Sequence, residues 1–446
     1  MIKLNNKLNI IAIFIITLSI IINIYTSLSI IPYRSTADDF QHFYDMHRWY
    51  EKQIIPYTGT RFQLCDTYKE EFTMPRVPGG IYYITYTLFY KIANENLYIA
   101  KIINYIFSLS IILIFLFWIF KRFGAIITSF MSVLVLCNGY LIRALTNFWN
   151  PNLTLIFGFI FFIFLFEYIC NDSELKTKLS AIFMFPALAI MAQAHFSVFF
   201  SIVPTVIVYL IIKYKKTFKY SLHFIIGIFI SFLLYLPYLI YEIKNNFYNT
   251  YLILEEKGAI NYIAFPKYQA FILFPTNEMS AIYIKHLDNI LNFWFSNPPL
   301  IFGFVFLLLS LIFSAICLIG SFYIIFNNFK KKIILNDKEL ALRDMFLILL
   351  LSMVVSTLFF LIAPPTTGSF HYLYGIFAIS YSYILFFIVK YKNTIINKKN
   401  ILCILLIFFS LNTFAMSLTI KRYINKYELK NNIEMNKQIN NYINKN

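Results

Sequence analysis

The chain contains about eleven apolar runs, most of them about 17 to 25 residues long, separated by polar segments. An α-helix rises about 1.5 Å per residue, so about 20 apolar residues match the ~30 Å hydrocarbon layer of a bilayer. The runs fall near residues 8–31, 97–120, 124–146, 151–170, 179–194, 196–213, 220–242, 298–326, 344–363, 370–390 and 400–419. This pattern predicts an all-α polytopic membrane protein.

The composition agrees with membrane insertion. Hydrophobic residues make up 59% of the chain and charged residues 13%, which lies outside the usage of soluble domains. The first run lacks a small-residue cleavage site, so we expect a retained membrane helix. The apolar stretch of residues 179–213 is too long for one crossing, and we place a turn at the sequence AQAHF.

The positive charges follow the membrane topology. The net charge is +17, but Lys and Arg gather in every second loop, at KRF, ELKTK, KYKKTFK, KKK and KYKNTIINKK. The alternate loops NFWNPN, AQAH and APPTTGS contain neither residue. The positive-inside rule therefore places the amino terminus inside and the carboxyl tail outside the cytoplasmic (inner) membrane, and no nucleic-acid partner is needed to explain the charge.

Several chemistries are excluded. The five cysteines are scattered and form no CxxC pair, which argues against a disulfide framework or a zinc site. The chain has no GxGxxG, no P-loop and no DxD sequence, so nothing indicates nucleotide binding.

The outer face is expected to hold the chemistry. Residues 1–420 are assigned to one membrane domain, whose outer loops 32–96 and 243–297 form the active-site face, and residues 421–446 to a short polar tail. In the first loop, Phe40, Phe43, Tyr44 and His47 have the spacing of an interfacial helix over residues 38–51. A second short helix is expected at IYYITYTLFYKI, with its tyrosines at the level of the lipid headgroups.

Two adjacent acids, Asp38 and Asp39, follow the first crossing by one helix turn. A carboxylate at this height can take a proton from an incoming hydroxyl as a general base, or it can simply be a solvated acid at a helix end. Asp38, His42 and Asp45 also share one helical face. They are an alternative divalent-cation site, although we expect no metal to be required.

The remaining site candidates are cations and polar side chains near the outer ends of crossings. Arg76, Arg143, Lys267 and His371 are available to meet the charge of a phosphate, whereas Arg143 alternatively extends to the nearby interface. Asn150 and Asn152 either cap a helix or bind a ligand, and Gln193 and His195 either bond between helices or line a pocket.

Several elements also follow one another in a recognisable order. They are one crossing, an outer loop with an acidic pair, VPGGIYYITYTLFYKIANENLYIAKIINYIFSL, NFWNPNLTLIF, AQAHFSVFF, YLPYLIYEIKNNFYNT and HYLYG. Over about residues 8–390 this order resembles bacterial membrane glycosyltransferases of the GT-C superfamily. The branch it resembles contains dolichyl-phosphate-mannose protein mannosyltransferases and aminoarabinose transferases.

The resemblance implies transfer of a sugar from a polyprenyl-phosphate carrier to an acceptor hydroxyl at the outer face, with inversion. It implies that Asp38 and Asp39, where relatives carry Asp-Glu, supply the base. Tyr82 and Tyr83 fall in an element that shapes the carrier-facing cavity in relatives. His371 and Tyr372 replace a late Arg-Tyr pair.

Other functions are compatible with the same crossings. The chain is alternatively a transporter or flippase of a lipid-linked saccharide, or an outer-face polysaccharide polymerase or ligase. As an enzyme, its partners would be the bilayer, a polyprenyl-phosphate sugar and a glycan, lipid or protein acceptor.

Overall fold

The computed structural model describes residues 2–31, 37–62, 74–170, 172–255, 269, 272–275, 301–362 and 370–397. Within these residues, eight helices are long and apolar enough to cross a membrane. The prediction of an all-α polytopic chain is therefore confirmed, with one small sheet added. The predicted crossing at 400–419 and the tail at 421–446 lie outside the described residues.

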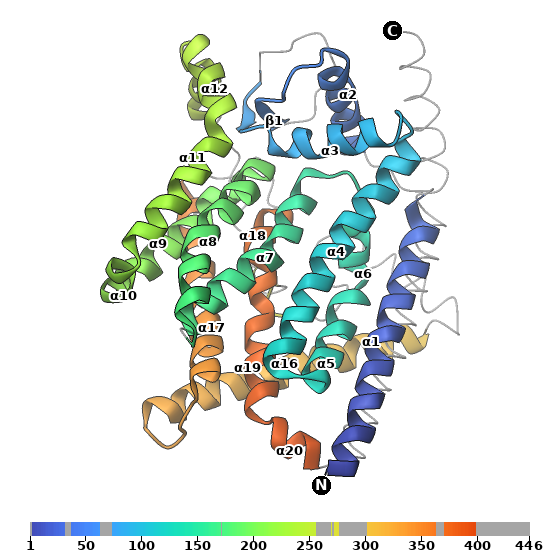
Figure 1. Cartoon of the computed structure of the whole chain (residues 1–446), viewed down its shortest axis with the longest axis vertical. Helices are drawn as coiled ribbons and strands as arrows, with labels where there is room; N and C mark the ends of the chain where they lie inside the picture. The colour runs from blue at the N-terminus through green and yellow to red at the C-terminus, as the bar shows by residue number, and fades with distance from the viewer. Residues whose placement is uncertain are drawn as a thin grey trace.

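Most of the long helices run side by side in one bundle, and α16 (Ile301–Phe329) crosses behind them (Figure 1). The long helices are α1 (Ile2–Ile30), α4 (Leu97–Phe123), α7 (Asn150–Cys170), α8 (Glu174–Ala194), α11 (Ser221–Lys244), α16 and α17 (Asp337–Ile362), followed by the series η4 (Phe370–Leu373), α18 (Tyr374–Phe377), η5 (Ala378–Ser380) and α19 (Tyr381–Lys390). The shorter pieces are α5 (Ala125–Leu136), α6 (Gly139–Leu145), η2 (Phe196–Phe200), α9 (Ile202–Ile212), α10 (Tyr214–Lys219) and α20 (Lys392–Asn397).

Two predicted crossings differ from the structure. The run at 124–146 is two helices, α5 and α6, because Asn138 interrupts the backbone between them. Its side chain accepts a hydrogen bond from the Leu141 N–H (3.2 Å) and donates one to the Pro275 carbonyl (2.9 Å). The predicted turn at AQAHF is confirmed at His195, whose backbone is extended. The following run, however, is a short 3-10 helix and the 11-residue helix α9.

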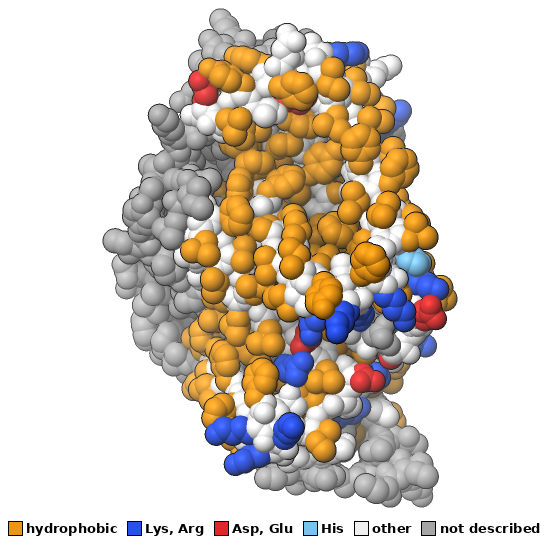
Figure 2. Space-filling model, turned by 90° about the vertical axis from the view of Figure 1, so that its left-hand side faces the viewer, with side chains coloured by type: hydrophobic (Ala, Val, Ile, Leu, Met, Phe, Trp, Pro, Cys, Tyr) orange, Lys and Arg blue, Asp and Glu red, His pale blue; other side chains and the backbone are white. Residues whose placement is uncertain are grey.

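The core lies around α7. Phe159, Phe161, Phe162 and Phe166 are fully buried, and Phe159 packs on Phe115 of α4 and on Tyr381 of α19. The outer flank of the bundle, by contrast, is apolar. Figure 2 shows hydrophobic side chains over the side formed by α11, where the exposed residues include Ile225 and Phe229. Such a face suits contact with lipid.

The two ends of the bundle carry different elements (Figure 1). The start of α1, the loop after α16 and α20 lie at one end, which we call the basic end. There Lys338 and Lys392 donate to the carbonyls of Arg122 (2.9 Å) and Phe123 (2.8 Å) at the end of α4. The opposite end, the loop end, carries α2 (Ala37–Glu51), β1 (Thr58–Arg61), β2 (Arg76–Pro78), α3 (Ile81–Ile92) and α12 (Tyr248–Glu255).

Candidate active site

The acidic pair begins a helix. Asp38 and Asp39 lie in the first turn of α2, and their side chains lie outside the described residues. Negative charge is favourable in a first helical turn because the N–H groups there are unpaired. The predicted helix over residues 38–51 is confirmed. On its buried side it presents Phe43, Asp45 and Met46 to the protein.

Helix α3 has the predicted bounds but not the predicted surroundings. Tyr82, Tyr83, Tyr86 and Tyr90 are buried in protein, so their rings contact other side chains and not lipid as expected. The reason is that α2 packs over α3, and Phe148 from the segment after α6 packs beneath it. Tyr86 meets the Phe148 ring at 4.7 Å, and the Tyr82 hydroxyl donates to the Phe148 carbonyl (3.4 Å).

A small antiparallel sheet places two arginines on one carboxylate. Strands β1 and β2 pair Arg61 with Arg76. Arg61 Nη2 lies 3.5 Å from Asp45 Oδ1, and Arg76 Nη1 lies 3.3 Å from Asp45 Oδ2. The Tyr83 hydroxyl donates to the same Oδ2 (2.9 Å). We call Asp45, Arg61, Arg76 and Tyr83 the arginine network.

The arginine network is buried, and this fixes the state of Tyr83. Burial, and then the negative charge of Asp45, raise the pKa of Tyr83 well above its ordinary value. Tyr83 therefore remains a phenol that donates to Asp45. Tyr83 and Asp45 thus attach α3 to α2, the helix that begins with the two acids.

Arg76 is held through its backbone as well as its side chain. Asn249 of α12 accepts from the Arg76 N–H (2.8 Å) and donates to the Arg76 carbonyl (3.0 Å). The Arg76 guanidinium also donates to the Gly59 carbonyl (3.4 Å). The bonds from Asn249 join the two long polar loops of the sequence at the loop end.

Gln193 reaches the start of α3 from the end of α8. Its Oε1 accepts from the Ile81 N–H (3.3 Å), and its side chain is buried. Within the described residues, its Nε2 has no hydrogen-bond partner. Gly79 and Gly80 make this approach possible. A Cβ on Gly79 would lie 2.4 Å from Gln193, and one on Gly80 would lie 1.9 Å from the Pro56 carbonyl oxygen.

We expect Gly79→Ala to destabilise the chain more than Gly124→Ala. Both glycines have a positive φ, +98° and +91°, but a Cβ on Gly124 would come no closer than 3.7 Å to its nearest neighbour. Gly124→Ala thus reports backbone strain alone, about 1–3 kcal/mol, and Gly79→Ala adds the clash. Thermal unfolding in detergent measures both. In a Gln193→Ala background, Gly79→Ala should lose less stability than in the parent, whereas the effect of Gly124→Ala should not change. Equal losses of stability for the two glycine variants in the parent would contradict the predicted clash.

Four aromatic side chains, centred on His371, gather at the end of α8. His195 and His371 meet edge to face with ring centroids 5.2 Å apart, and Tyr372 stacks on His371 at 4.7 Å. Trp149 contacts His371 at 4.9 Å. The structure therefore brings three of the predicted residues, His195, His371 and Tyr372, into one cluster.

His195 is a neutral hydrogen-bonding group. It lies between α8 and η2, and its Nδ1 pairs with the Ser197 hydroxyl at 2.6 Å. Burial, and secondarily the neighbouring His371, lower the pKa of His195 well below its ordinary value. At neutral pH it can donate or accept a hydrogen bond, but it supplies no positive charge.

The two predicted asparagines hold helix ends together. Asn150, the first residue of α7, donates to the Ala194 carbonyl at the end of α8 (2.9 Å). Asn152 donates to the Asn147 carbonyl (3.1 Å). Within the described residues, Asn152 Oδ1 and both side-chain polar atoms of Asn147 are buried without a hydrogen-bond partner.

The other predicted residues lie apart or outside the described part. The side chain of Arg143, on α6, and all of Lys267 lie outside the described residues. Of the alternative metal ligands, His42 meets the Tyr82 ring edge to face at 5.3 Å, and Asp45 is engaged by the arginines. No cluster of three or more metal-ligating side chains occurs among the described residues.

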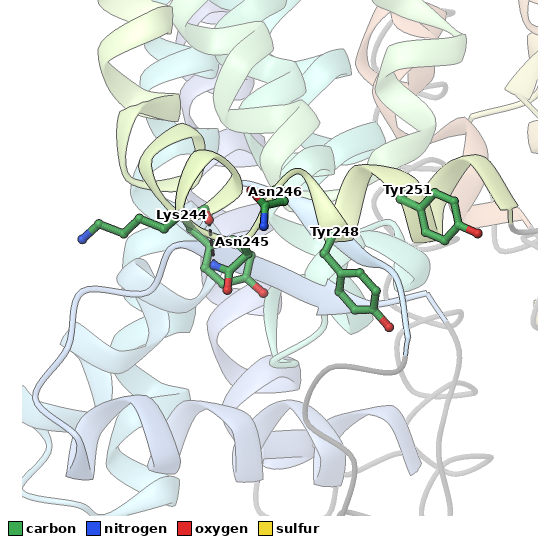
Figure 3. Close-up of a pocket in the computed structure, with 6 residues that line it drawn as sticks. Lys244, Asn245, Asn246, Tyr248 and Tyr251 are labelled. Atoms are coloured by element: carbon green, nitrogen blue, oxygen red, sulfur yellow. Dashed lines mark hydrogen bonds between the residues drawn. The ribbon is translucent and has the colours of Figure 1, made fainter.

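A pocket of about 590 Å³ opens at the junction of α11 and α12. Figure 3 shows Tyr248 and Tyr251 projecting from α12, and Lys244 extending from the end of α11. Tyr241, Asn245 and Asn246 complete the lining. The Tyr241 ring stacks on Tyr57 at 4.3 Å, which places the pocket beside β1. The sequence pattern does not indicate this pocket, because its residues come together only through the break between two helices.

Comparison with known proteins gives one structural likeness. No family model and no curated protein matches the sequence. The structure is similar to the crystal structure of ArnT from Cupriavidus metallidurans in the apo state, with a TM-score of 0.45 and 10% sequence identity. The match covers 86% of this chain and 71% of that one.

Proposed function

We propose that this chain is an integral membrane glycosyltransferase. It transfers a sugar from a polyprenyl-phosphate donor to an acceptor hydroxyl, with inversion, on the extracytoplasmic side. One observation carries the proposal. Helix α2 carries Asp38 and Asp39 in its first turn, and its buried Asp45 pairs with two arginines. These residues lie at the end of the bundle where a membrane-borne donor would present its phosphate.

In the proposed reaction, Asp38, supported by Asp39, accepts the proton of the acceptor hydroxyl. The acceptor oxygen attacks the anomeric carbon, and the bond from that carbon to the phosphate oxygen breaks on the opposite face. The electron pair leaves with the lipid phosphate, and one displacement inverts the anomeric centre. General-base catalysis contributes about 10²–10⁴-fold to such a step.

The departing phosphate needs positive charge or hydrogen-bond donors nearby. We assign this role to Arg76, Arg143, Lys267, His371 and Tyr372. Gln193 and the neutral His195 are suited to sugar hydroxyls, because each has buried hydrogen-bonding atoms near the start of α3. Tyr82, Tyr83, Asn150 and Asn152 have protein partners and would position the cavity wall.

The products of the reaction test the proposal. The purified full chain in liposomes would be supplied with a radiolabelled polyprenyl-phosphate hexose and a mixed glycan and lipid acceptor extract. We expect labelled acceptor and an equal amount of polyprenyl phosphate. Release of polyprenyl diphosphate would favour a polymerase or ligase, and movement of intact donor between leaflets would favour a flippase. Either of these results, in place of sugar transfer, would contradict the proposal.

A further inference from the structure

The guanidinium of Arg61 is buried with unused hydrogen-bond donors. Strand β1 carries it into the arginine network, where its side chain is 2% exposed. Its Nη2 lies 3.5 Å from Asp45 Oδ1, an ion-pair contact without hydrogen-bond geometry. Within the described structure, neither Nε nor Nη2 makes a hydrogen bond. Buried donors of this kind are costly unless a partner is supplied, and a ligand can be that partner.

Asp45 does not supply all the hydrogen-bond acceptors that Arg61 needs, because its carboxylate also binds Tyr83 and Arg76. Its Oδ2 receives the Tyr83 hydroxyl (2.9 Å) and Arg76 Nη1 (3.3 Å), both closer than the contact from Arg61. Asp45 therefore orients the Arg61 guanidinium through the ion-pair contact at Nη2, and the N–H groups of Nε and Nη2 have no hydrogen-bond acceptor among the described residues. A guanidinium edge presents two parallel N–H groups, which match two oxygens of a tetrahedral oxyanion such as a phosphate ester.

The position of Arg61 relates it to the proposed base. Asp45, which holds it, follows Asp38 by seven residues on α2, so the two positions share a helix face about 10 Å apart along the axis. This separation leaves room for a sugar ring between a base at the start of α2 and a phosphate at Arg61. The sequence pattern does not indicate Arg61, because its pairing with Arg76 across β1 and β2 exists only in the folded chain.

We propose that Arg61 binds the phosphate group of the polyprenyl-phosphate donor through Nε and Nη2, with Asp45 as the residue that positions the guanidinium. This inference rests on the proposed function, since the lipid phosphate is the donor's leaving group. A free phosphate ion offers the same oxygens, so the test includes both.

The test measures binding of sugar-free polyprenyl phosphate to the full chain in detergent. Arg61→Gln is expected to weaken binding by about 10- to 100-fold, because two charge-assisted hydrogen bonds are lost. Arg61→Lys, which keeps the charge but not the fork, should fall between this variant and the parent. Arg122→Gln is the matched control. Arg122 is another buried arginine, paired with Glu167 and Asp172 near the basic end, and its loss should leave binding unchanged.

A folded Arg61→Gln variant that binds polyprenyl phosphate as tightly as the parent would overturn the inference. If the variant does not fold, amide hydrogen exchange in the parent chain tests whether the lipid phosphate binds at β1 and β2. Polyprenyl phosphate is expected to slow amide exchange in β1 and β2 at concentrations where inorganic phosphate has no effect. Slowing by inorganic phosphate alone, or no slowing by either, would contradict the assignment to the donor.

The binding assay separates this inference from the proposed function. Binding of polyprenyl phosphate through Arg61 in a chain that transfers no sugar would leave the inference standing and remove the proposed reaction. If the parent chain transfers sugar but its Arg61→Gln variant still binds polyprenyl phosphate normally, the proposed function stands and the inference about Arg61 is wrong.

Discussion

Asp38→Asn should lower the rate of sugar transfer by about 10²–10⁴-fold, the usual contribution of a general base. An amide keeps the shape of the side chain but accepts no proton. The loss should therefore appear in kcat, whereas KM for the donor changes little. Asp39→Asn should cause a smaller loss, because Asp39 supports the base. Initial rates with a radiolabelled polyprenyl-phosphate hexose measure both.

The control for this prediction is Asp172→Asn. Asp172 is a carboxylate that pairs with Arg122 near the basic end, far from α2 in the chain, and its replacement should leave transfer at the parental rate. All variants are compared at equal amounts of folded protein in the membrane. Parental rates in both Asp38→Asn and Asp39→Asn would remove the acidic pair from the mechanism.

The second large effect is expected on stability. Asp45→Asn removes the only described carboxylate that pairs with Arg61, and it weakens the hydrogen bond from Tyr83. Breaking a buried ion pair by removing one partner typically costs about 3–5 kcal/mol, because the remaining charge is left uncompensated. We therefore expect a marked fall in the thermal midpoint of the detergent-solubilised chain, together with loosening of β1 and β2 against α2.

Glu174→Gln is the matched substitution for Asp45→Asn. Glu174 pairs with Lys178 (2.9 Å), and the two side chains are 65% and 40% exposed. Pairs that water reaches contribute about 0–1 kcal/mol, so this variant should keep nearly the parental midpoint. Equal midpoints for Asp45→Asn and the parent would show that the arginine network does not hold the loop end together.

Much of the fold follows from the apolar runs and from local spacing. The length of each run predicted most of the crossings, since the bilayer sets the length of a helix. The period of Phe40, Phe43, Tyr44 and His47 predicted α2, and the run at 81–92 predicted α3 with its observed bounds. The break at His195 was also predictable, because a single helix of that length is longer than the bilayer requires.

The remaining features depend on contacts between distant segments. Strands β1 and β2 have four and three residues, and no short hairpin turn joins them, so neither alternation nor turn chemistry signals the sheet. The burial of the α3 tyrosines depends on α2 covering them. His195 and His371 meet because η2, which follows α8, packs against η4. Arg61 shows no signal in the sequence, because a lone arginine in a polar loop is ordinarily solvated.

The central claim is that the acids and the arginine network act on the extracytoplasmic side, and labelling of an introduced cysteine, with the buried Cys137, Cys170 and Cys317 left in place, tests it most directly. Ile55 and Ile334 are 67% and 88% exposed, the first between α2 and β1 and the second in the loop after α16. Ile55→Cys and Ile334→Cys would be made in a background with Cys65 and Cys403 replaced by Ser. An impermeant maleimide added to intact cells should label position 55, whereas position 334 should react only after lysis. Labelling of position 334 but not of position 55 in intact cells would contradict the claim.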